Sequence, residues 1–597
     1  MASLIRAKDA QTLPGLFRAR ISRSPDMRAY LVYDADERAW DAITWRSIGE
    51  RAGKFQAAIE RLGLQKGDRV ALLLPNGIDW VSFDMAALSL GLVVVPLYSY
   101  DSPSNHCFIL NHSCARLALI DTRKRWEAIA ASEPVPATEQ IWVREDPSGP
   151  LPKPLKRLAD VLPEIGAPSP DIVAKPEDLA TLIYTSGTTG RPKGVMLSHA
   201  AILWNAEGVT KFIAPSQSDV FLSILPLAHA FERTVGYYVP IMAGATVAYA
   251  RSVELLREDL ATVQPSVFLS VPRLYERIYA AIRERAARNV LKRFLLAVTV
   301  GIGWQHFEWK QGRGPRPGLL SRLVRPLLHH LVAWRILMAF GGRTRVAVSG
   351  GAPLPREVAR FLIGLGLPLV EGYGLTEAAP VVTATALEDN LPGSAGRPLK
   401  GSEVRLSDEA ELLVRTPSIM QGYWKDPDAT AAAFDAKGWL KTGDIAEIRD
   451  GRVFIRGRLK DFIVLSTGEK ISPDPIEAAI LRDPLVGQAC VLGDGKPFAV
   501  AVLVLERERW SKLANELKAD PHEPNAEAVN AEVLTRIARN LMDFSKPAQI
   551  RGVHLVLEPW SIDHGLLTPT FKVKRYAIEA KFAKEVAALY AAHAVFR

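Results

Sequence analysis

The chain has 597 residues, of which 48% are hydrophobic and 23% charged, so it is a globular sequence long enough for more than one core. Its three cysteines, Cys107, Cys114 and Cys490, show neither a disulfide framework nor metal-ligand spacing, which indicates free thiols in a reducing compartment. The N-terminus lacks the apolar core of a signal peptide, and no uninterrupted apolar run approaches the roughly 18 residues that span a bilayer. We therefore expect a cytoplasmic protein.

The net charge of +9 is concentrated in one segment. Residues 281–345 carry thirteen lysines and arginines against two glutamates, interleaved with leucines and with Trp304, Trp309 and Trp334. This mixture suits an anionic lipid surface, although a solvated pair of helices with a buried leucine face would have the same composition. No nucleic-acid-binding motif accompanies the charge, so we expect no nucleic-acid partner.

Three segments are predicted, in chain order, to be strand–helix–strand units: residues 69–97, 220–249 and 345–370. Short apolar strands alternating with helices predict an α/β fold with mostly parallel sheets layered with helices. In such folds ligands lie beyond the carboxyl ends of the strands. The loops "ILPLAHA", "SGGAPL" and "EGYGLTE" each follow a predicted strand, so they could converge on one site.

The pattern changes after about residue 460. A strand, loop and helix are followed by two strands around a glycine-rich turn, a strand "GVHLVLE" and a final amphipathic helix. We predict a small α+β domain over residues 460–597, following a large N-terminal domain over residues 1–459.

The stretch "YTSGTTGRPKG", residues 184–194, predicts a phosphate-binding loop. Its glycines let backbone N–H groups approach an anion, and its hydroxyls add donors. It is not a Walker loop, because Lys193 is followed by Gly194 rather than by serine or threonine. Strands are predicted on both sides, and the next helix begins only after Ser198, a suitable N-cap. We therefore expect a flap between two strands.

This loop resembles the phosphate-binding signature of the adenylate-forming superfamily, which contains acyl-CoA synthetases, peptide-synthetase adenylation domains and luciferases. The motifs "SGGAPL", "EGYGLTE", "GWLKTGD" and "GRLKDFIVLSTGEKISP" follow in the order typical of that family. The resemblance implies a large domain, a mobile C-terminal domain and a reaction in two halves. A carboxylate attacks the α-phosphate of ATP to give acyl-AMP and pyrophosphate, and a thiol such as that of coenzyme A then displaces AMP.

The resemblance also implies where the nucleotide binds. The loop would hold the β- and γ-phosphates, "SGGAP" and Tyr373 would enclose the adenine, Thr376 would meet the α-phosphate, and Asp444 with Arg458 would bind the ribose. The positions implied are Thr185, Ser186, Gly187, Thr188, Thr189, Lys193, Gly350, Gly351, Ala352, Pro353, Gly372, Tyr373, Gly374, Leu375, Thr376, Asp444 and Arg458.

The same resemblance implies the metal, hinge and catalytic positions. Glu377, together with Thr185, would hold Mg²⁺, which usually takes one or two protein carboxylates when it is bound to ATP. Lys460 would be the hinge of the mobile domain. His229 would either position the acyl carboxylate or serve the architecture. The ending "LTPTFKVKR" departs from the commoner P-x-T-x-x-G-K pattern of the family, and it makes Lys572 the expected catalytic lysine, with Lys574 as its rival.

The segments "LPLAHAFER" and "LTPTFKVKR", together with the long insertion before "VAVSGGAPL", resemble the long-chain fatty acid branch of the superfamily. The expected substrates are thus a long-chain fatty acid, ATP with Mg²⁺, and coenzyme A. A fatty acyl-AMP ligase that loads a carrier protein, or a non-catalytic binding protein, are the alternatives. Because the acid is poorly soluble, we expect peripheral association with the inner face of a membrane through residues 281–345. The oligomeric state is left open, a homodimer included.

Overall fold

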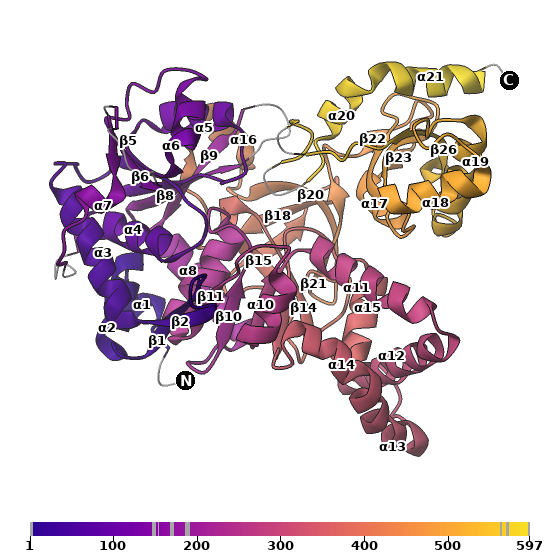
Figure 1. Cartoon of the computed structure of the whole chain (residues 1–597), viewed down its shortest axis with the longest axis horizontal. Helices are drawn as coiled ribbons and strands as arrows, with labels where there is room; N and C mark the ends of the chain where they lie inside the picture. Colours follow the sequence, from indigo (N-terminus) through magenta and orange to yellow (C-terminus); the bar gives the residue numbers. More distant parts are fainter. Residues whose placement is uncertain are drawn as a thin grey trace.

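The computed structural model describes residues 4–145, 151–152, 154–166, 172–185, 191–561, 564–568 and 572–594. Two sheets layered with helices form a large body, and the chain after residue 460 forms a smaller α+β unit, at the upper right of Figure 1. The predicted α/β fold class is confirmed. The domain boundary at residue 460 stays a prediction.

The first sheet of the described chain is eight-stranded and carries the glycine-rich loop near one edge. Its strands β3 and β4 are almost wholly buried and β3 pairs parallel with β4 and β5, as expected for continuous apolar runs covered by helices such as α4 (Ile78–Ser89). In spatial order the strands are β19 (Gly422–Tyr423), β9 (Lys193–Ser198), β8 (Leu179–Thr185), β4 (Val93–Pro96), β3 (Arg69–Leu73), β5 (Ala115–Thr122), β6 (Gln140–Glu145) and β7 (Leu155–Arg157).

The second sheet is nine-stranded, and its central strands from β14 to β1 run parallel. The loops that follow β10, β13 and β14 therefore leave the same edge of the sheet, as the sequence predicted. In spatial order the strands are β16 (Arg397–Pro398), β15 (Val381–Ala384), β14 (Leu369–Gly374), β13 (Val346–Ser349), β12 (Val267–Ser270), β10 (Val220–Ser223), β11 (Thr246–Tyr249), β1 (Arg28–Asp34) and β2 (Ala39–Thr44).

The helix between the two strands of the unit predicted over residues 220–249 is only partly an α-helix. Glu232–Tyr238 form a π-helical turn, and α9 (Val239–Ala243) continues it. Every residue of the π turn is buried, and Arg233 and Tyr238 in it hydrogen-bond to Asp84 of α4. The π-helical turn thus occurs where the chain contacts a distant helix, and the periodicity of the sequence does not encode such contacts. π turns are frequent at functional sites.

A third, four-stranded antiparallel sheet links the body to the smaller unit. It consists of β17 (Glu403–Leu406), β18 (Glu411–Arg415), β20 (Leu440–Arg449) and β21 (Arg452–Arg458). Its last two strands carry "TGD" and the start of "GRLKD" opposite each other, with Asp444 and Arg458 as register partners.

The C-terminal unit has its own apolar core around a three-stranded sheet of β24 (Val486–Leu492), β25 (Ala499–Leu505) and β26 (Ile550–Val556). Helices α17 (Pro473–Ile480), α18 (Arg507–Leu517) and α19 (Glu527–Asn540) belong to it. The single final helix that the sequence predicted is two, α20 (Arg575–Lys581) and α21 (Ala583–Ala594), with a break at Phe582. Ile578, Phe582 and Val586, before, at and after the break, belong to one buried cluster.

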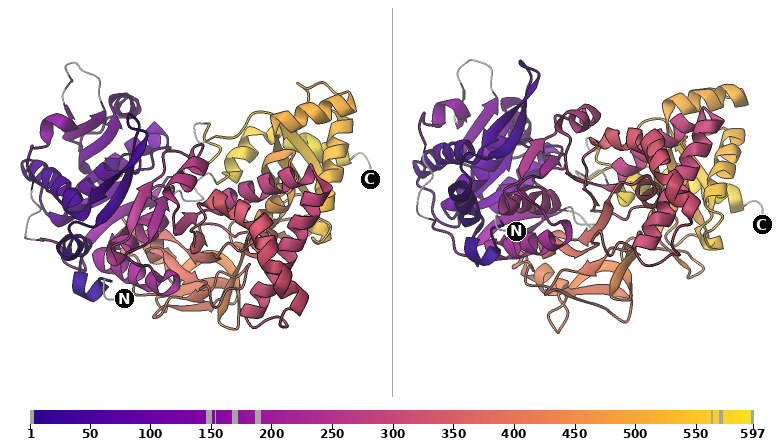
Figure 2. Two further views of the ribbon diagram at one scale, coloured as in Figure 1. Left: turned by 60° about the horizontal axis from the view of Figure 1, so that its bottom comes forward. Right: turned by 90° about the horizontal axis from the view of Figure 1, so that it is seen from below.

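A helical protrusion, α11 (Pro272–Ala287), α12 (Val290–Lys310), α13 (Leu319–Leu328) and α14 (Trp334–Leu337), leaves the body at the lower right of Figure 1 and is seen again in Figure 2. Within it, Leu319–Phe340 is a helical stretch long and apolar enough to cross a membrane by length and mean hydropathy (1.2) alone. The sequence expectation had required an uninterrupted apolar run, which Arg322, Arg325 and Arg335 break.

The protrusion packs on the body with a close approach between two glycines. A methyl group on Gly303 of α12 would lie 1.8 Å from the carbonyl oxygen of Gly364 in α15 (Arg356–Leu365). The two helices therefore meet backbone to backbone, which a larger side chain would prevent.

We expect Gly303→Ala to lower the free energy of unfolding by about 1–3 kcal/mol, because the added methyl group forces α12 away from α15. The matched control is Gly301→Ala, two residues earlier on α12, where an added Cβ meets nothing within 4 Å. There the higher helix propensity of alanine should leave stability unchanged or raise it by up to about 1 kcal/mol. Urea unfolding of both variants measures this, and equal stabilities would contradict the contact.

Candidate active site

The glycine-rich loop joins two antiparallel strands, as predicted. Thr185 at the end of β8 is the register partner of Lys193 at the start of β9. The helix α8 (His199–Ile213) begins only after β9, where the Ser198 hydroxyl accepts a hydrogen bond from the backbone N–H of Ala201 at 3.2 Å. The loop is thus not the start of a helix. Ser186, Gly187, Thr188 and Thr189 lie outside the described residues.

Lys193 and Glu377 meet through a residue that the motifs did not include. The ammonium nitrogen of Lys193 lies 5.1 Å from the ring centroid of Tyr423, and the Tyr423 hydroxyl donates to Oε1 of Glu377 at 2.8 Å. Burial, and then the nearby Glu377 carboxylate, raise the pKa of Tyr423, so it acts as a neutral donor. Tyr423 is held there because β19 pairs with β9. No spacing in the sequence pointed to it.

Asp444 and Arg458 form the second group of predicted residues that the structure brings together. Nε of Arg458 donates to Oδ1 of Asp444 at 3.2 Å, and the Tyr373 hydroxyl donates to Oδ2 at 2.6 Å. Asp444 is nearly buried, whereas the Arg458 side chain is about half exposed (48%). Tyr373 lies four residues before Glu377, so this group adjoins the first one along β14 and its following turn.

The predicted adenine wall follows β13 and touches the loop after β10. Gly351 has φ +82°, a conformation that favours glycine. A Cβ on Gly350 would lie 3.0 Å from the ring of Phe231, two residues beyond His229. The predicted positions Ala352, Pro353, Gly372, Gly374, Leu375 and Thr376 lie in this loop or at the end of β14.

His229 is held as a neutral imidazole. Its Nδ1 accepts a hydrogen bond from the backbone N–H of Phe231 at 3.2 Å, which leaves the proton on Nε2. Burial, and then the positive charge of Lys572, lower the pKa of His229 to about 4. At neutral pH the ring can therefore donate a hydrogen bond without carrying charge.

Lys572 belongs to the C-terminal unit, and its charge influences the pKa of His229 in the body. In turn, Arg458 and Asp444 of the body influence the pKa of Lys572. Burial among surrounding protein atoms, and then Arg458, lower the pKa of Lys572, while the carboxylates of Asp474, Asp444 and Asp461 oppose the shift. Its accessible surface nevertheless places Lys572 among the exposed residues.

The other C-terminal residues are placed as follows. Lys574 precedes α20, and its backbone N–H donates to the Leu566 carbonyl at 2.9 Å. Lys460, the predicted hinge, lies in an exposed turn directly after β21. Its hinge role stays a prediction, as does the choice of Lys572 over Lys574 for catalysis.

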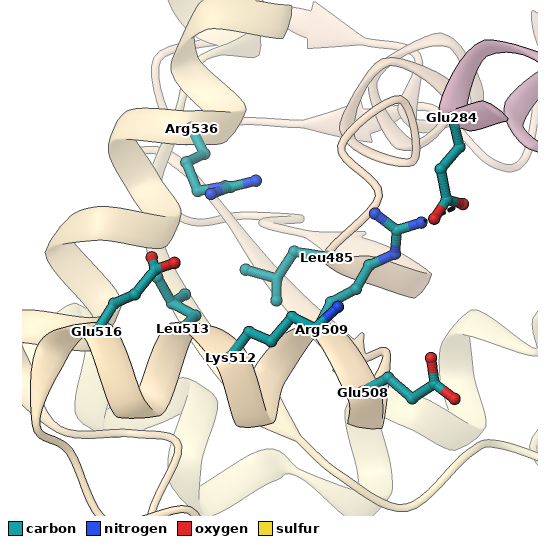
Figure 3. A pocket seen from close by; sticks show the side chains of 8 residues that line it. All are labelled: Glu284, Leu485, Glu508, Arg509, Lys512, Leu513, Glu516 and Arg536. Carbon is teal, nitrogen blue, oxygen red and sulfur yellow. Dashed lines mark hydrogen bonds and ion pairs between the residues drawn. The ribbon is translucent and has the colours of Figure 1, made fainter. Parts of the chain in front are cut away.

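A cavity of about 230 Å³ lies away from these residues, between the end of α11 and the helices α18 and α19 (Figure 3). An ion pair at 2.8 Å between Glu284 and Arg509 crosses it and connects the body to the C-terminal unit. The other lining residues are Leu485, Glu508, Lys512, Leu513, Glu516 and Arg536. Because none of them is a motif residue, we assign this cavity no part in the site.

Comparison with known families covers nearly the whole chain. Residues 17–424 match the AMP-binding enzyme family, and residues 460–594 match the AMP-binding enzyme C-terminal domain. The chain belongs to the AMP-binding enzyme family. The family resemblance predicted from the motifs is therefore confirmed.

Individual relatives agree with this assignment. The chain is similar to the long-chain-fatty-acid–CoA ligase FadD15 of Mycobacterium bovis, with 33% identity over 589 residues and 94% of each chain covered. It is also similar to the chloroplastic long-chain-fatty-acid–[acyl-carrier-protein] ligase AEE15 of Arabidopsis thaliana, with 28% identity over 98% of this chain and 88% of that one. The adenylation domain of a carboxylic acid reductase from Segniliparus rugosus, solved with AMP, shares the fold with a TM-score of 0.75 and 20% identity, covering 99% and 97% of the two chains.

A buried ion pair next to His229 was also missed from the sequence. Arg233 pairs with Asp84 of α4, and the two side chains are 1% and 0% exposed. Arg233 also donates to the Thr181 hydroxyl of β8 at 2.7 Å. The pair therefore joins the segment that carries His229 to the strand that leads into the glycine-rich loop. The adjacent "ER" in "AHAFER" was the available signal, but neither partner could be identified from the sequence.

We expect Tyr423→Phe to raise the KM for ATP about tenfold, because Glu377 loses a hydrogen bond to a charged group, about 1.5 kcal/mol. The exposed Tyr576 provides the matched control, since Tyr576→Phe removes a hydroxyl from a surface position. ATP-dependent pyrophosphate release measures both KM values. An unchanged KM for Tyr423→Phe would show that Tyr423 does not position Glu377.

Proposed function

We propose that this AMP-binding enzyme activates a long-chain fatty acid with ATP and transfers the acyl group to coenzyme A. The observation that carries the proposal is that residues expected from separate motifs come together: Lys193 and Glu377 both contact Tyr423, and Arg458 and Tyr373 both donate to Asp444. Similarity over 94% of the chain to a long-chain-fatty-acid–CoA ligase supports the same substrate class.

In the first half-reaction, charged residues of the site would stabilise the groups that react. An oxygen of the fatty acid carboxylate attacks the α-phosphorus of ATP, and the bond from that phosphorus to pyrophosphate breaks. Catalysis of this step depends on alignment and on neutralising charge. Lys572 would stabilise the negative charge between carboxylate and α-phosphate, and Lys193 would stabilise the departing pyrophosphate. The neutral His229 can donate from Nε2 to the acyl carboxylate without binding it as tightly as a cation would.

Mg²⁺ is the expected companion of ATP, and the residues present fit it. The Glu377 carboxylate accepts a hydrogen bond from Tyr423 at Oε1, and carboxylate oxygens are the hard ligands that Mg²⁺ prefers. The described residues hold no group of three or more histidine, cysteine, aspartate or glutamate side chains able to cage a metal. A metal that arrives with the phosphates needs no such cage, and it would supply charge neutralisation there.

In the second half-reaction the coenzyme A thiol would attack the acyl carbon, the bond to AMP would break, and the thiol proton would pass to solvent. Lys572 is not required for that step. We propose that the C-terminal unit turns at Lys460 between the two halves, and the exposed turn at this position supports a hinge because few contacts have to change there.

One assay tests the proposal and its alternative. The enzyme is supplied with ATP, Mg²⁺ and palmitate, with and without coenzyme A. We expect palmitoyl-CoA and AMP when coenzyme A is present. Acyl-AMP that accumulates unchanged with coenzyme A and is consumed by an acyl carrier protein would favour the carrier-protein ligase, which the similarity to AEE15 supports. No ATP turnover with acids of any chain length would overturn both.

We expect Lys572→Ala to lower acyl-AMP formation by at least about a hundredfold, because a charge-stabilising group lost from a transition state costs roughly this much. The same variant should still form thioester from preformed acyl-AMP. Lys574→Ala, two residues away, is the matched control and should retain both half-reactions. Equal loss of both halves in Lys572→Ala would reject the role, and loss of the first half in Lys574→Ala alone would move it to that residue.

We also propose a cytoplasmic location. The three cysteines are unpaired, which is the expected state in a reducing compartment. Homodimer formation remains a proposal to be tested by light scattering of the purified protein.

A further inference from the structure

An exposed apolar ridge runs along the outer face of the helical protrusion. Leu320, Leu323 and Leu327 of α13 are 75%, 66% and 58% exposed. Leu331 and Trp334 continue the ridge at intervals of four and three residues, so the five side chains recur with helical spacing. The buried leucine face that the sequence left open as an alternative is therefore wrong for these positions.

The rest of the protrusion is well anchored, so the ridge is not a consequence of a loose helix. Leu328 and Ala333, between the ridge residues, are 7% and 1% exposed and line a small space together with Gly303 of α12 and Gly364 of α15. The Ser321 and Gln305 side chains hydrogen-bond between α13 and α12 at 3.2 Å. Through Gly303, α12 in turn meets α15 backbone to backbone. One face is packed, and the opposite face presents leucine to solvent.

The charges around the ridge have one sign. No aspartate or glutamate occurs between Glu308 and Glu357, whereas Arg322 and Arg335 are exposed within the ridge helices. Leucine and tryptophan on one face with arginine beside them is the pattern of a helix that lies in the interface of an anionic membrane. In Figure 1, α13 is also the part of the protrusion farthest from the C-terminal unit, so a planar surface could reach it.

We propose that α13 and α14 lie in the surface of an anionic lipid bilayer, with the ridge of Leu320, Leu323, Leu327, Leu331 and Trp334 inserted among the acyl chains. The inference rests on the proposed function, since a membrane is where a long-chain acid accumulates. It identifies the face of the molecule that contacts the membrane from which the substrate comes.

Two other occupants fit the ridge less well. Crossing the bilayer would bury Arg325 and Arg335 in hydrocarbon and pull Phe340, which is 1% exposed, out of the core of the body. A second copy of the chain in a two-fold dimer would bring together two surfaces that carry arginine and no acidic residue, and like charges oppose that contact. An in-plane helix on anionic lipid satisfies both the apolar and the charged residues.

Vesicle flotation of the full chain tests the proposal. Vesicles of phosphatidylcholine with and without phosphatidylglycerol are used, at low and high salt. We expect binding to the anionic vesicles that weakens in high salt but persists, because salt screens the arginines and leaves the apolar term. The triple variant Leu320→Ser, Leu323→Ser, Leu327→Ser should bind at least about tenfold more weakly. Arg322→Gln with Arg335→Gln should lose most of the salt-dependent part.

The matched control is Leu517→Ser with Met542→Ser, which changes exposed apolar residues on the C-terminal unit and should bind as the unaltered chain does. Equal flotation of the triple variant, or no flotation of the unaltered chain, would overturn the proposal. So would a dimer in solution that the triple variant makes monomeric. Thermal unfolding of each variant shows that it is folded.

A soluble acid separates this inference from the proposed function. The triple variant should form octanoyl-CoA from free octanoate, without vesicles, at the rate of the unaltered chain. If the unaltered chain forms no thioester from any acid but still floats with anionic vesicles, the proposed function fails and the membrane contact stands. If it forms thioester and does not float, the membrane contact fails alone.

Discussion

The buried ion pair of Arg233 and Asp84 is the contact on which the geometry of the site depends. Asp84 belongs to a helix that covers the first sheet, and Arg233 follows a strand of the second. Arg233 also donates a hydrogen bond to the Thr181 hydroxyl, in the strand that leads into the glycine-rich loop. An isolated charge in this position would cost several kcal/mol, so the two partners have to stay together. The pair thereby connects the segment that carries His229 to the strand that ends at Thr185.

The rest of the site consists of small clusters in which a tyrosine contacts a charged side chain. Tyr423 connects Lys193 to Glu377, and Tyr373 connects β14 to Asp444. Both tyrosines are neutral donors with their pKa raised by burial, so they orient carboxylates without cancelling their charge. The two lysines come from different parts of the chain, Lys193 from the start of β9 and Lys572 from the C-terminal unit.

The protrusion and the site share one support. α12 packs on α15, and α15 leads into β14, which carries Tyr373. The outer helices therefore rest on the helix that leads into the strand of Tyr373.

Much of the fold and several site residues follow from the sequence alone. Buried parallel strands such as β3 and β4 are encoded by short apolar runs, and the flap before Lys193 is encoded by glycine and hydroxyl residues between two such runs. The family resemblance implied that Asp444 and Arg458 serve one ribose, and the structure makes them register partners joined by a hydrogen bond. Only the tertiary structure decided which residues act on them: the contact of Tyr423 with Glu377, the partner of Arg233, the π turn after His229, and the outward face of the α13 leucines. Each of these depends on which distant segment lies opposite, and periodicity along one segment carries no information about that.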